Sequence, residues 1–292
     1  MNKTLIGKEN WLFLQNDSCR EMEIHNDDYC NVSPNFYKKY EKYKEKVILV
    51  VFPNKSFMYK QYLPDGYDLK YRKPFDIYAK YFDNHIIDGY DLLKDEENVF
   101  YKTDTHINNK GSLVIYYHFI DKINELFALN IPKQVCELKK IECESLIEMN
   151  LAIGDLTWSS NLGDQSLSCI HDTFYEIVDN PQLYTKYIFN DNKDILLFKY
   201  DDNILVDETL LYSNKILDWH MLSKYILFKN NNKNTENKTV VFFYDSFLCS
   251  SMQLYINLFT NVYFVKSIFN PKIIDLINPD YVFEFRCERF LF

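Results

Sequence analysis

Two long apolar runs along the chain alternate with segments of helical spacing. Residues 47–52 (VILVVF) form a continuous apolar run rich in β-branched residues. Such a run is typical of a central strand that is covered on both faces. Residues 37–46 precede it and place a tyrosine at every third position among lysines. This spacing predicts an amphipathic helix whose tyrosines face the core.

The same alternation returns in the last third of the chain. Residues 239–244 (TVVFFY) predict a second buried strand, and residues 261–268 and 280–285 predict two more short strands. Residues 271–278 predict a helix with a proline in its first turn. Alternating strands and helices of this kind predict an α/β fold. The predicted architecture is a three-layer α/β/α sandwich around a central, mostly parallel sheet.

Length and composition predict one domain over residues 1–292, with an elaborated middle region at about residues 121–228. Of the 292 residues, 47% are hydrophobic and 17% aromatic, which is enough to build a large core. The formal net charge is −9 and there is no sustained basic segment. We therefore expect no nucleic acid as the main partner.

The chain also carries little sign of a membrane segment. No stretch has the apolar length needed to cross a bilayer, so no transmembrane segment is expected. The first residues lack an apolar core and a small-residue cleavage pattern. We therefore expect a cytoplasmic location for the chain as given, or a periplasmic one if a leader was removed.

Polar residues that follow predicted strands are the candidates for chemistry. Asp104 and His106 lie two positions apart after an apolar segment, and Ser246 follows the strand predicted at 239–244. A serine hydroxyl needs a histidine to take its proton and a carboxylate to orient that histidine. At a turn from strand to helix, Ser246 would also gain backbone N–H groups that stabilise an oxyanion. From the residues alone, helix capping and loop hydrogen bonding are the more common explanation of such positions.

Several neighbours are candidates for substrate binding. Tyr244 and Asp245 directly precede Ser246. Asn108 could donate a hydrogen bond to an oxyanion or cap the helix that follows it. Glu284 and Arg289, near the end of the last predicted strand, could line a sugar-binding site or form internal ion pairs.

Two further motifs are assigned a structural role. Residues 153–158 (IGDLTW) contain Gly154, which we interpret as a turn. The pair His171–Asp172 has the residue types of a metal site, but no histidine at helical spacing accompanies it. We interpret this pair as polar residues exposed to solvent and expect no metal site.

Five segments of the chain resemble a known family. They resemble, in family order, the SGNH-hydrolase-like bacterial polysaccharide O-acetyltransferases of the alginate-acetylation AlgX and AlgJ type. The matching segments are 7–14 (GKENWLFL), 52–64 (FPNKSFMYKQYLP), 101–112 (YKTDTHINNKGS), 244–247 (YDSF) and 278–289 (NPDYVFEFRCER). The resemblance therefore spans nearly the whole chain and implies an SGNH-hydrolase-like domain.

The resemblance also implies an activity. It makes Ser246 the nucleophile, His106 the general base and Asp104 the carboxylate that orients the histidine. The implied reaction is acetyl transfer to sugar hydroxyls of a bacterial surface or extracellular polysaccharide, through an acyl-serine intermediate. The implied partners are a glycan acceptor and an acyl donor such as acetyl-CoA, with no tightly bound cofactor. A carbohydrate esterase with the same three residues and a non-catalytic glycan-binding or assembly protein are the alternatives.

Overall fold

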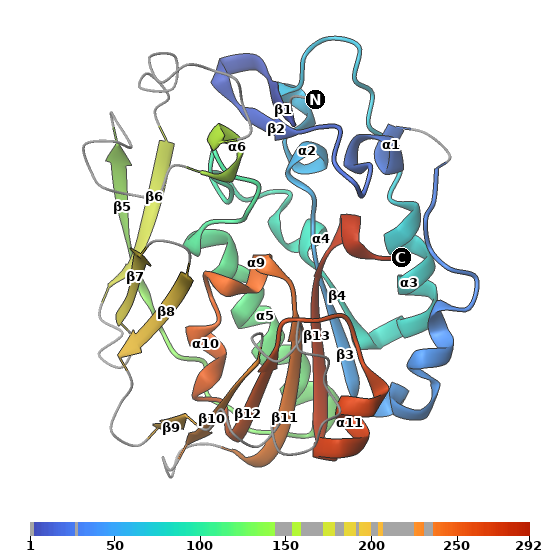
Figure 1. Cartoon of the computed structure of the whole chain (residues 1–292), viewed down its shortest axis with the longest axis vertical. Helices are drawn as coiled ribbons and strands as arrows, with labels where there is room; N and C mark the ends of the chain where they lie inside the picture. The colour runs from blue at the N-terminus through green and yellow to red at the C-terminus, as the bar shows by residue number, and fades with distance from the viewer. Residues whose placement is uncertain are drawn as a thin grey trace.

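A seven-stranded sheet forms the centre of the part of the chain that the computed structural model describes (Figure 1). That part comprises residues 3–26, 29–143, 154–158, 172–178, 184–190, 193–199, 204–206, 225–230 and 236–292. The strand order is β4 (Ile86–Asp88), β3 (Val47–Phe52), β13 (Tyr281–Cys287), β11 (Glu236–Tyr244), β12 (Phe259–Val265), β10 (Tyr225–Asn230) and β9 (Ile204–Val206). The first five strands pair in parallel, whereas β10 and β9 are antiparallel to their neighbours.

The four central strands are those that the apolar runs predict. The bounds of β3 match the prediction, and those of β11, β12 and β13 differ from it by one to three residues. All six residues of β3 are buried. A strand buried on both faces has no polar side, which is why these strands appear in the sequence as uninterrupted apolar runs.

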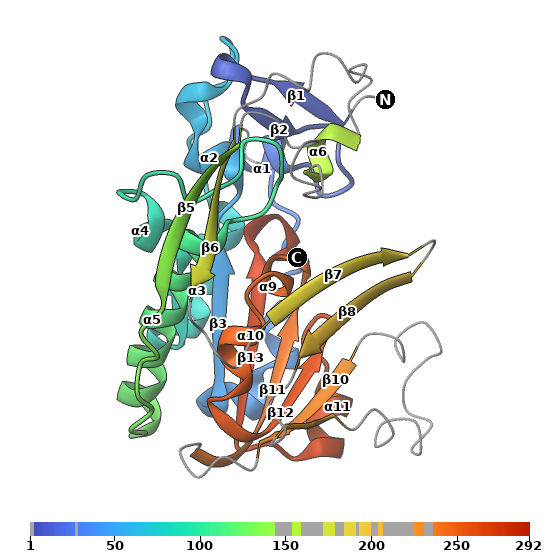
Figure 2. The ribbon, with the colours of Figure 1, turned by 90° about the vertical axis from the view of Figure 1, so that its left-hand side faces the viewer.

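Helices cover both faces of the sheet. Alternate residues of β3 enter two separate cores. Ile48 and Val50 share one core with helix α5 (Asn109–Phe127), and Leu49 shares the other with α3 (Lys73–Phe82) and α11 (Pro271–Ile277). Figure 2 shows α5 on one side of the central strands and α11 on the other. The predicted three-layer α/β/α sandwich is confirmed.

Short elements gather beyond the carboxyl ends of the central strands (Figure 1). They are β1 (Thr4–Ile6), β2 (Leu12–Leu14), α1 (Glu21–Asn26), α2 (Lys55–Met58) and α6 (Asp155–Trp158). Further short helices of the described residues are η1 (Lys8–Asn10), η4 (Lys60–Tyr62), η5 (Asp83–His85), α4 (Gly89–Leu93), α9 (Ser246–Cys249), α10 (Gln253–Ile256) and η7 (Glu288–Phe290). Loops at this edge of a parallel sheet are where binding and catalytic groups collect.

The helix predicted at residues 37–46 is not a single α-helix. Two 3₁₀ helices stand there instead, η2 (Phe36–Lys39) and η3 (Glu41–Lys46). A 3₁₀ helix has three residues per turn, so side chains spaced by three lie directly above one another. The tyrosine spacing fits this geometry, and Tyr40 and Tyr43 are indeed buried.

Only parts of the elaborated middle region lie within the described residues. There β5 (Glu137–Cys143) pairs with β6 (Asp172–Val178), and β7 (Tyr184–Asn190) pairs with β8 (Lys193–Lys199), both antiparallel. His171 lies outside the described residues. Among the helices of the described segments, none combines the length and the apolar character needed to cross a membrane.

Replacing Phe242 by alanine tests the central core. Phe242 lies fully buried on β11, with its ring centroid 4.8 Å from that of Phe264 and 4.9 Å from that of Phe283. We expect Phe242→Ala to lower the free energy of unfolding by about 3–5 kcal/mol, because it leaves a cavity between packed rings. Denaturant unfolding measures this loss. Ile77→Ala is the control, because the Ile77 side chain is partly exposed. We expect it to change the free energy of unfolding by about 0.5 kcal/mol or less. Equal losses of unfolding free energy in both variants would contradict this description of the core.

Candidate active site

The turn between β11 and α9 holds Ser246 at the carboxyl edge of the sheet. Asp245 caps α9, and its Oδ1 accepts a hydrogen bond of 2.9 Å from Phe247 N–H. Its Oδ2 accepts one of 2.6 Å from Cys287 N–H at the end of β13. Ser246 is the first residue of α9, where backbone N–H groups have no acceptor within the helix. The turn is therefore tied to the neighbouring strand and presents both a hydroxyl and a backbone donor.

The histidine comes from the loop before α5. An antiparallel bridge between Phe100 and Ile107 closes the base of this loop. The Oδ1 atom of Asp104 accepts hydrogen bonds from His106 N–H at 2.9 Å and from the ring Nδ1 of His106 at 2.6 Å. Asp104 thus fixes both the backbone and the imidazole of His106.

His106 and Ser246 meet although 140 positions separate them. The Nε2 atom of His106 lies 2.9 Å from Ser246 Oγ. Since the Asp104 carboxylate can only accept, the proton on Nδ1 points to it, which leaves Nε2 free to accept the Ser246 hydroxyl proton. The Phe247 ring packs against the imidazole at 4.7 Å between centroids. The predicted proximity of Asp104, His106 and Ser246 is confirmed.

The charge state of Asp104 follows from its hydrogen bonds. Burial raises the pKa of its carboxyl, but the hydrogen bond and charge of His106 and two backbone N–H donors outweigh burial. Together they lower the pKa of Asp104 to about 2. Asp104 is therefore ionised at neutral pH and suited to stabilise an imidazolium.

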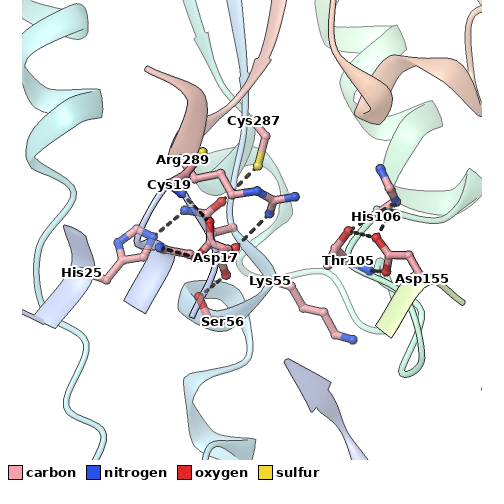
Figure 3. Close-up of polar contacts among 12 residues, drawn as sticks. Asp17, Cys19, His25, Lys55, Ser56, Thr105, His106, Asp155, Cys287 and Arg289 are labelled. Carbon is pink, nitrogen blue, oxygen red and sulfur yellow. Dashed lines mark hydrogen bonds and ion pairs between the residues drawn. The ribbon is translucent and has the colours of Figure 1, made fainter. Parts of the chain in front are cut away.

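Asp155 is a functional residue that the sequence reasoning missed. Its Oδ1 accepts from Thr105 N–H at 2.8 Å and its Oδ2 from the Thr105 hydroxyl at 2.6 Å (Figure 3). Its own N–H donates to Asp104 Oδ2 at 3.0 Å. Asp155 therefore holds the residue between Asp104 and His106. The only signal in the sequence was its position directly after Gly154, in a segment interpreted as a turn.

Gly154 is required by close packing on the same loop. A Cβ atom at this position would lie 2.2 Å from the Thr103 carbonyl oxygen. That oxygen also accepts a hydrogen bond from Leu156 N–H. The turn predicted here is instead the start of a short helix, α6, which follows Gly154 directly. The backbone at Gly154 approaches the loop so closely that only glycine fits.

The interpretation of Asp172 as a polar residue exposed to solvent is wrong. Its side chain is buried, and its carboxylate accepts from Lys102 N–H, Thr103 N–H and the Thr103 hydroxyl at 3.0–3.1 Å. Buried carboxylates of this kind satisfy loop N–H groups that no strand or helix partner satisfies.

A group of possible metal ligands lies at the same place. Nitrogen and oxygen atoms of Asp104, His106 and Asp155 lie within 4.8 Å of one another. These atoms are engaged in the hydrogen bonds to the loop described above. We assign them to the geometry of the loop and not to metal binding.

The residues beside Ser246 and His106 expected to bind substrate are structural. Tyr244 is a buried core residue. Asp245 caps α9, and burial raises the pKa of its carboxyl. Asn108 is fully buried; its Oδ1 accepts from the N–H groups of Lys110 and Gly111, which caps α5. The alternative weighed for Asn108, helix capping, is therefore the observed one.

Glu284 and Arg289 are likewise buried and form internal ion pairs. Glu284 accepts from the Tyr40 hydroxyl at 2.7 Å and from Arg286 Nε at 3.0 Å. Arg289 donates to Glu21 Oε2 at 2.8 Å. Both side chains have their polar atoms directed into the protein, so the expectation that they line a sugar-binding site is wrong.

The sequence of this chain matches a known protein family. The family model described as SGNH hydrolase-like domain, acetyltransferase AlgX, matches residues 4–174, more than half of the chain. The chain belongs to this family. No curated protein sequence matches it.

Solved structures share its fold at low sequence identity. Bacillus cereus PatB1 superposes with a TM-score of 0.61 at 14% identity, over 99% of this chain and 96% of that one. A DHHW family protein from Eubacterium siraeum gives 0.54 at 16% identity, over 99% and 94%. The O-acetyltransferase domain of Pseudomonas putida AlgJ gives 0.53 at 14% identity, over 99% and 91%. Each of these structures shares the fold of this chain over at least 91% of its own length.

Removing the Asp155 carboxylate tests its role in the loop. We expect Asp155→Ala to slow the reaction of Ser246 with an arylsulfonyl fluoride about 10- to 100-fold, because a displaced His106 activates the hydroxyl poorly. Mass spectrometry of quenched samples measures the rate. Asp91→Ala is the control, since Asp91 is exposed and pairs with Lys94. Equal rates in wild type and Asp155→Ala would contradict the assignment.

The lowered pKa of Asp104 predicts a pH dependence of stability. A carboxyl whose pKa falls from 3.8 to about 2 on folding stabilises the protein above about pH 4, and this contribution is lost as the pH falls toward 2. Asp104→Asn lacks the contribution. We therefore expect the difference in free energy of unfolding between wild type and Asp104→Asn to shrink below pH 4. Urea unfolding at several pH values measures it; a constant difference would contradict the prediction.

Proposed function

We propose that the protein is a serine-dependent O-acetyltransferase that acetylates sugar hydroxyls of a bacterial surface or extracellular polysaccharide. The observation that supports the proposal most strongly is the continuous contact from Asp104 through His106 to Ser246, at 2.6 and 2.9 Å. It lies in a chain of an acetyltransferase family, and the similar AlgJ domain is itself named an O-acetyltransferase.

The first half of the reaction forms an acyl-enzyme. Ser246 Oγ attacks the donor carbonyl while His106 Nε2 takes the hydroxyl proton. Asp104 stabilises the resulting imidazolium, and the Ser246 N–H donates to the tetrahedral oxyanion. When the intermediate collapses, the bond to the leaving group breaks and His106 returns the proton to that group.

The second half transfers the acetyl group. A sugar hydroxyl attacks the acetyl carbonyl, and His106 takes its proton. The ester bond to Ser246 then breaks, and Ser246 Oγ recovers a proton from His106. The same three side chains serve both halves. In the second half His106 takes the proton of the attacking sugar hydroxyl and returns a proton to Ser246 Oγ, which reverses its part in the first half.

Substitution of Ser246 tests the proposal. We expect Ser246→Ala to lose acetyl transfer to an oligosaccharide by at least about 10³-fold, while the fold is retained. Ser250→Ala, one helical turn further on, is the matched control and keeps the activity. Acetylated oligosaccharide is measured with p-nitrophenyl acetate or acetyl-CoA as donor. Continued transfer by Ser246→Ala would refute the mechanism.

A carbohydrate esterase remains the second candidate. The His106 and Asp104 side chains are each 23% exposed, so water has access to the edge of the site. If water reaches the acyl-enzyme faster than a sugar does, the products are acetate and free enzyme. The same assay separates the two activities: acetylated sugar supports the transferase, acetate alone supports the esterase. Absence of both, with Ser246 unmodified, supports a non-catalytic glycan-binding protein.

A further inference from the structure

Lys55 is a buried lysine beside the site that the mechanism does not use. It begins α2 three positions after the end of β3, and it is 2% exposed. Within the described part of the chain, no carboxylate oxygen lies within the 4.0 Å of an ion pair to its Nζ. Burying an ammonium without a direct counter-ion is costly. The position of Lys55 therefore calls for a compensating role.

In the described part of the chain, the Lys55 ammonium donates its hydrogen bonds to the loop that carries His106. Its Nζ donates to the backbone carbonyl of Lys102 at 2.8 Å and to that of Asp104 at 3.0 Å. It also lies over the rings of Trp11 and Phe13, 5.2 and 5.6 Å from their centroids. The ammonium thus binds two carbonyls of the loop and rests on an aromatic base formed by β2 and the residue before it.

The N–H groups of the same loop bind carboxylates. Asp172 accepts from residues 102 and 103, Asp155 from residue 105, and Asp104 from residue 106. N–H groups therefore point to three negative charges, while two carbonyls point to one positive charge. Figure 3 shows Lys55 extending between the buried polar residues around Arg289 and the group of Thr105, His106 and Asp155.

We propose that Lys55 is a positioning residue: its buried ammonium holds the backbone that carries Asp104 and His106, so that the imidazole meets Ser246. Without this cation, the carbonyl of residue 104 loses the Lys55 donor, and the carbonyl of residue 102 keeps only the N–H of Leu12. The three carboxylates also lose the attraction of the Lys55 charge. Burial lowers the pKa of Lys55 to about 7, against the attraction of Asp172, Asp104, Asp155 and Glu21. The effect of Lys55 on catalysis rests on the proposed function. Its effect on the position of the His106 imidazole does not.

Two readouts on Lys55→Met test the inference. The first is the low-field NMR signal of the His106 Nδ1 proton in its hydrogen bond to Asp104, assigned by its loss in His106→Ala. We expect this signal in wild type and its loss in Lys55→Met. The second is acetylation of Ser246 by p-nitrophenyl acetate. We expect kcat to fall about 10- to 100-fold with KM changed less than about 2-fold, because positioning and not binding is impaired.

Matched variants separate positioning from general damage. Lys55→Arg keeps a cation with several donors and is expected to restore part of kcat and the signal. Lys60→Met removes an exposed lysine of the neighbouring η4 and should behave as wild type. If Lys55→Met does not fold, Lys55→Gln replaces it; it keeps an amide donor and is expected to lose the signal in part.

The outcomes are distinct. A folded Lys55→Met or Lys55→Gln with the wild-type signal and wild-type kcat overturns the inference. If wild type shows no acetylation of Ser246 from any donor, the proposed function fails. The NMR signal still decides whether Lys55 positions the loop, since that measurement needs no turnover.

Discussion

The hydrogen bond between His106 Nε2 and Ser246 Oγ is the contact on which the site depends. At 2.9 Å it joins two loops that lie 140 positions apart in the chain. The rate of proton transfer falls steeply when the distance between such donor and acceptor atoms increases. Both loops must therefore keep their positions to within a fraction of an ångström. The parallel sheet provides the frame, because the strand that precedes Ser246 and the loop before α5 both end at its carboxyl edge. Asp245 adds a direct tie, since its carboxylate reaches across from the serine turn to the end of β13.

Charged side chains hold the loop that carries His106 in place. Loop residues without regular secondary structure leave backbone groups unsatisfied, and each must find another partner. Here Asp172, Asp155 and Asp104 accept from the N–H groups, and Lys55 donates to the carbonyls. Such an arrangement loses stability through desolvation, but it leaves the loop few alternative conformations. These interactions restrict the loop around Asp104 and His106 to one conformation. The cost is the desolvation of buried charges that an apolar core would not contain.

Much of the framework could be predicted from the sequence. Continuous apolar runs identify buried parallel strands with little ambiguity, and β3 and β11 show this. The motifs around Asp104 and Ser246 could be recognised through the resemblance to the family, whereas the residues alone left helix capping open. The 3₁₀ form of residues 36–46 could not, since a tyrosine at every third position fits both helix types loosely. The roles of Asp155, Asp172 and Lys55 depend on contacts between distant segments, and isolated charged residues carry no periodic pattern. For the same reason the sequence left open whether Glu284 and Arg289 line a sugar-binding site or form internal ion pairs, and only the structure shows their buried partners.

The attachment site of the acetyl group tests the central claim most directly. Wild-type protein would be mixed with an activated acetyl ester, quenched within its first turnovers, digested and mapped by mass spectrometry. The account predicts one acetylated peptide, modified at Ser246, which forms quickly in wild type and about 10³-fold or more slowly in His106→Ala. Acetylation at another nucleophile, such as Cys249 or Lys55, followed by transfer to sugar while Ser246 stays unmodified, would contradict it.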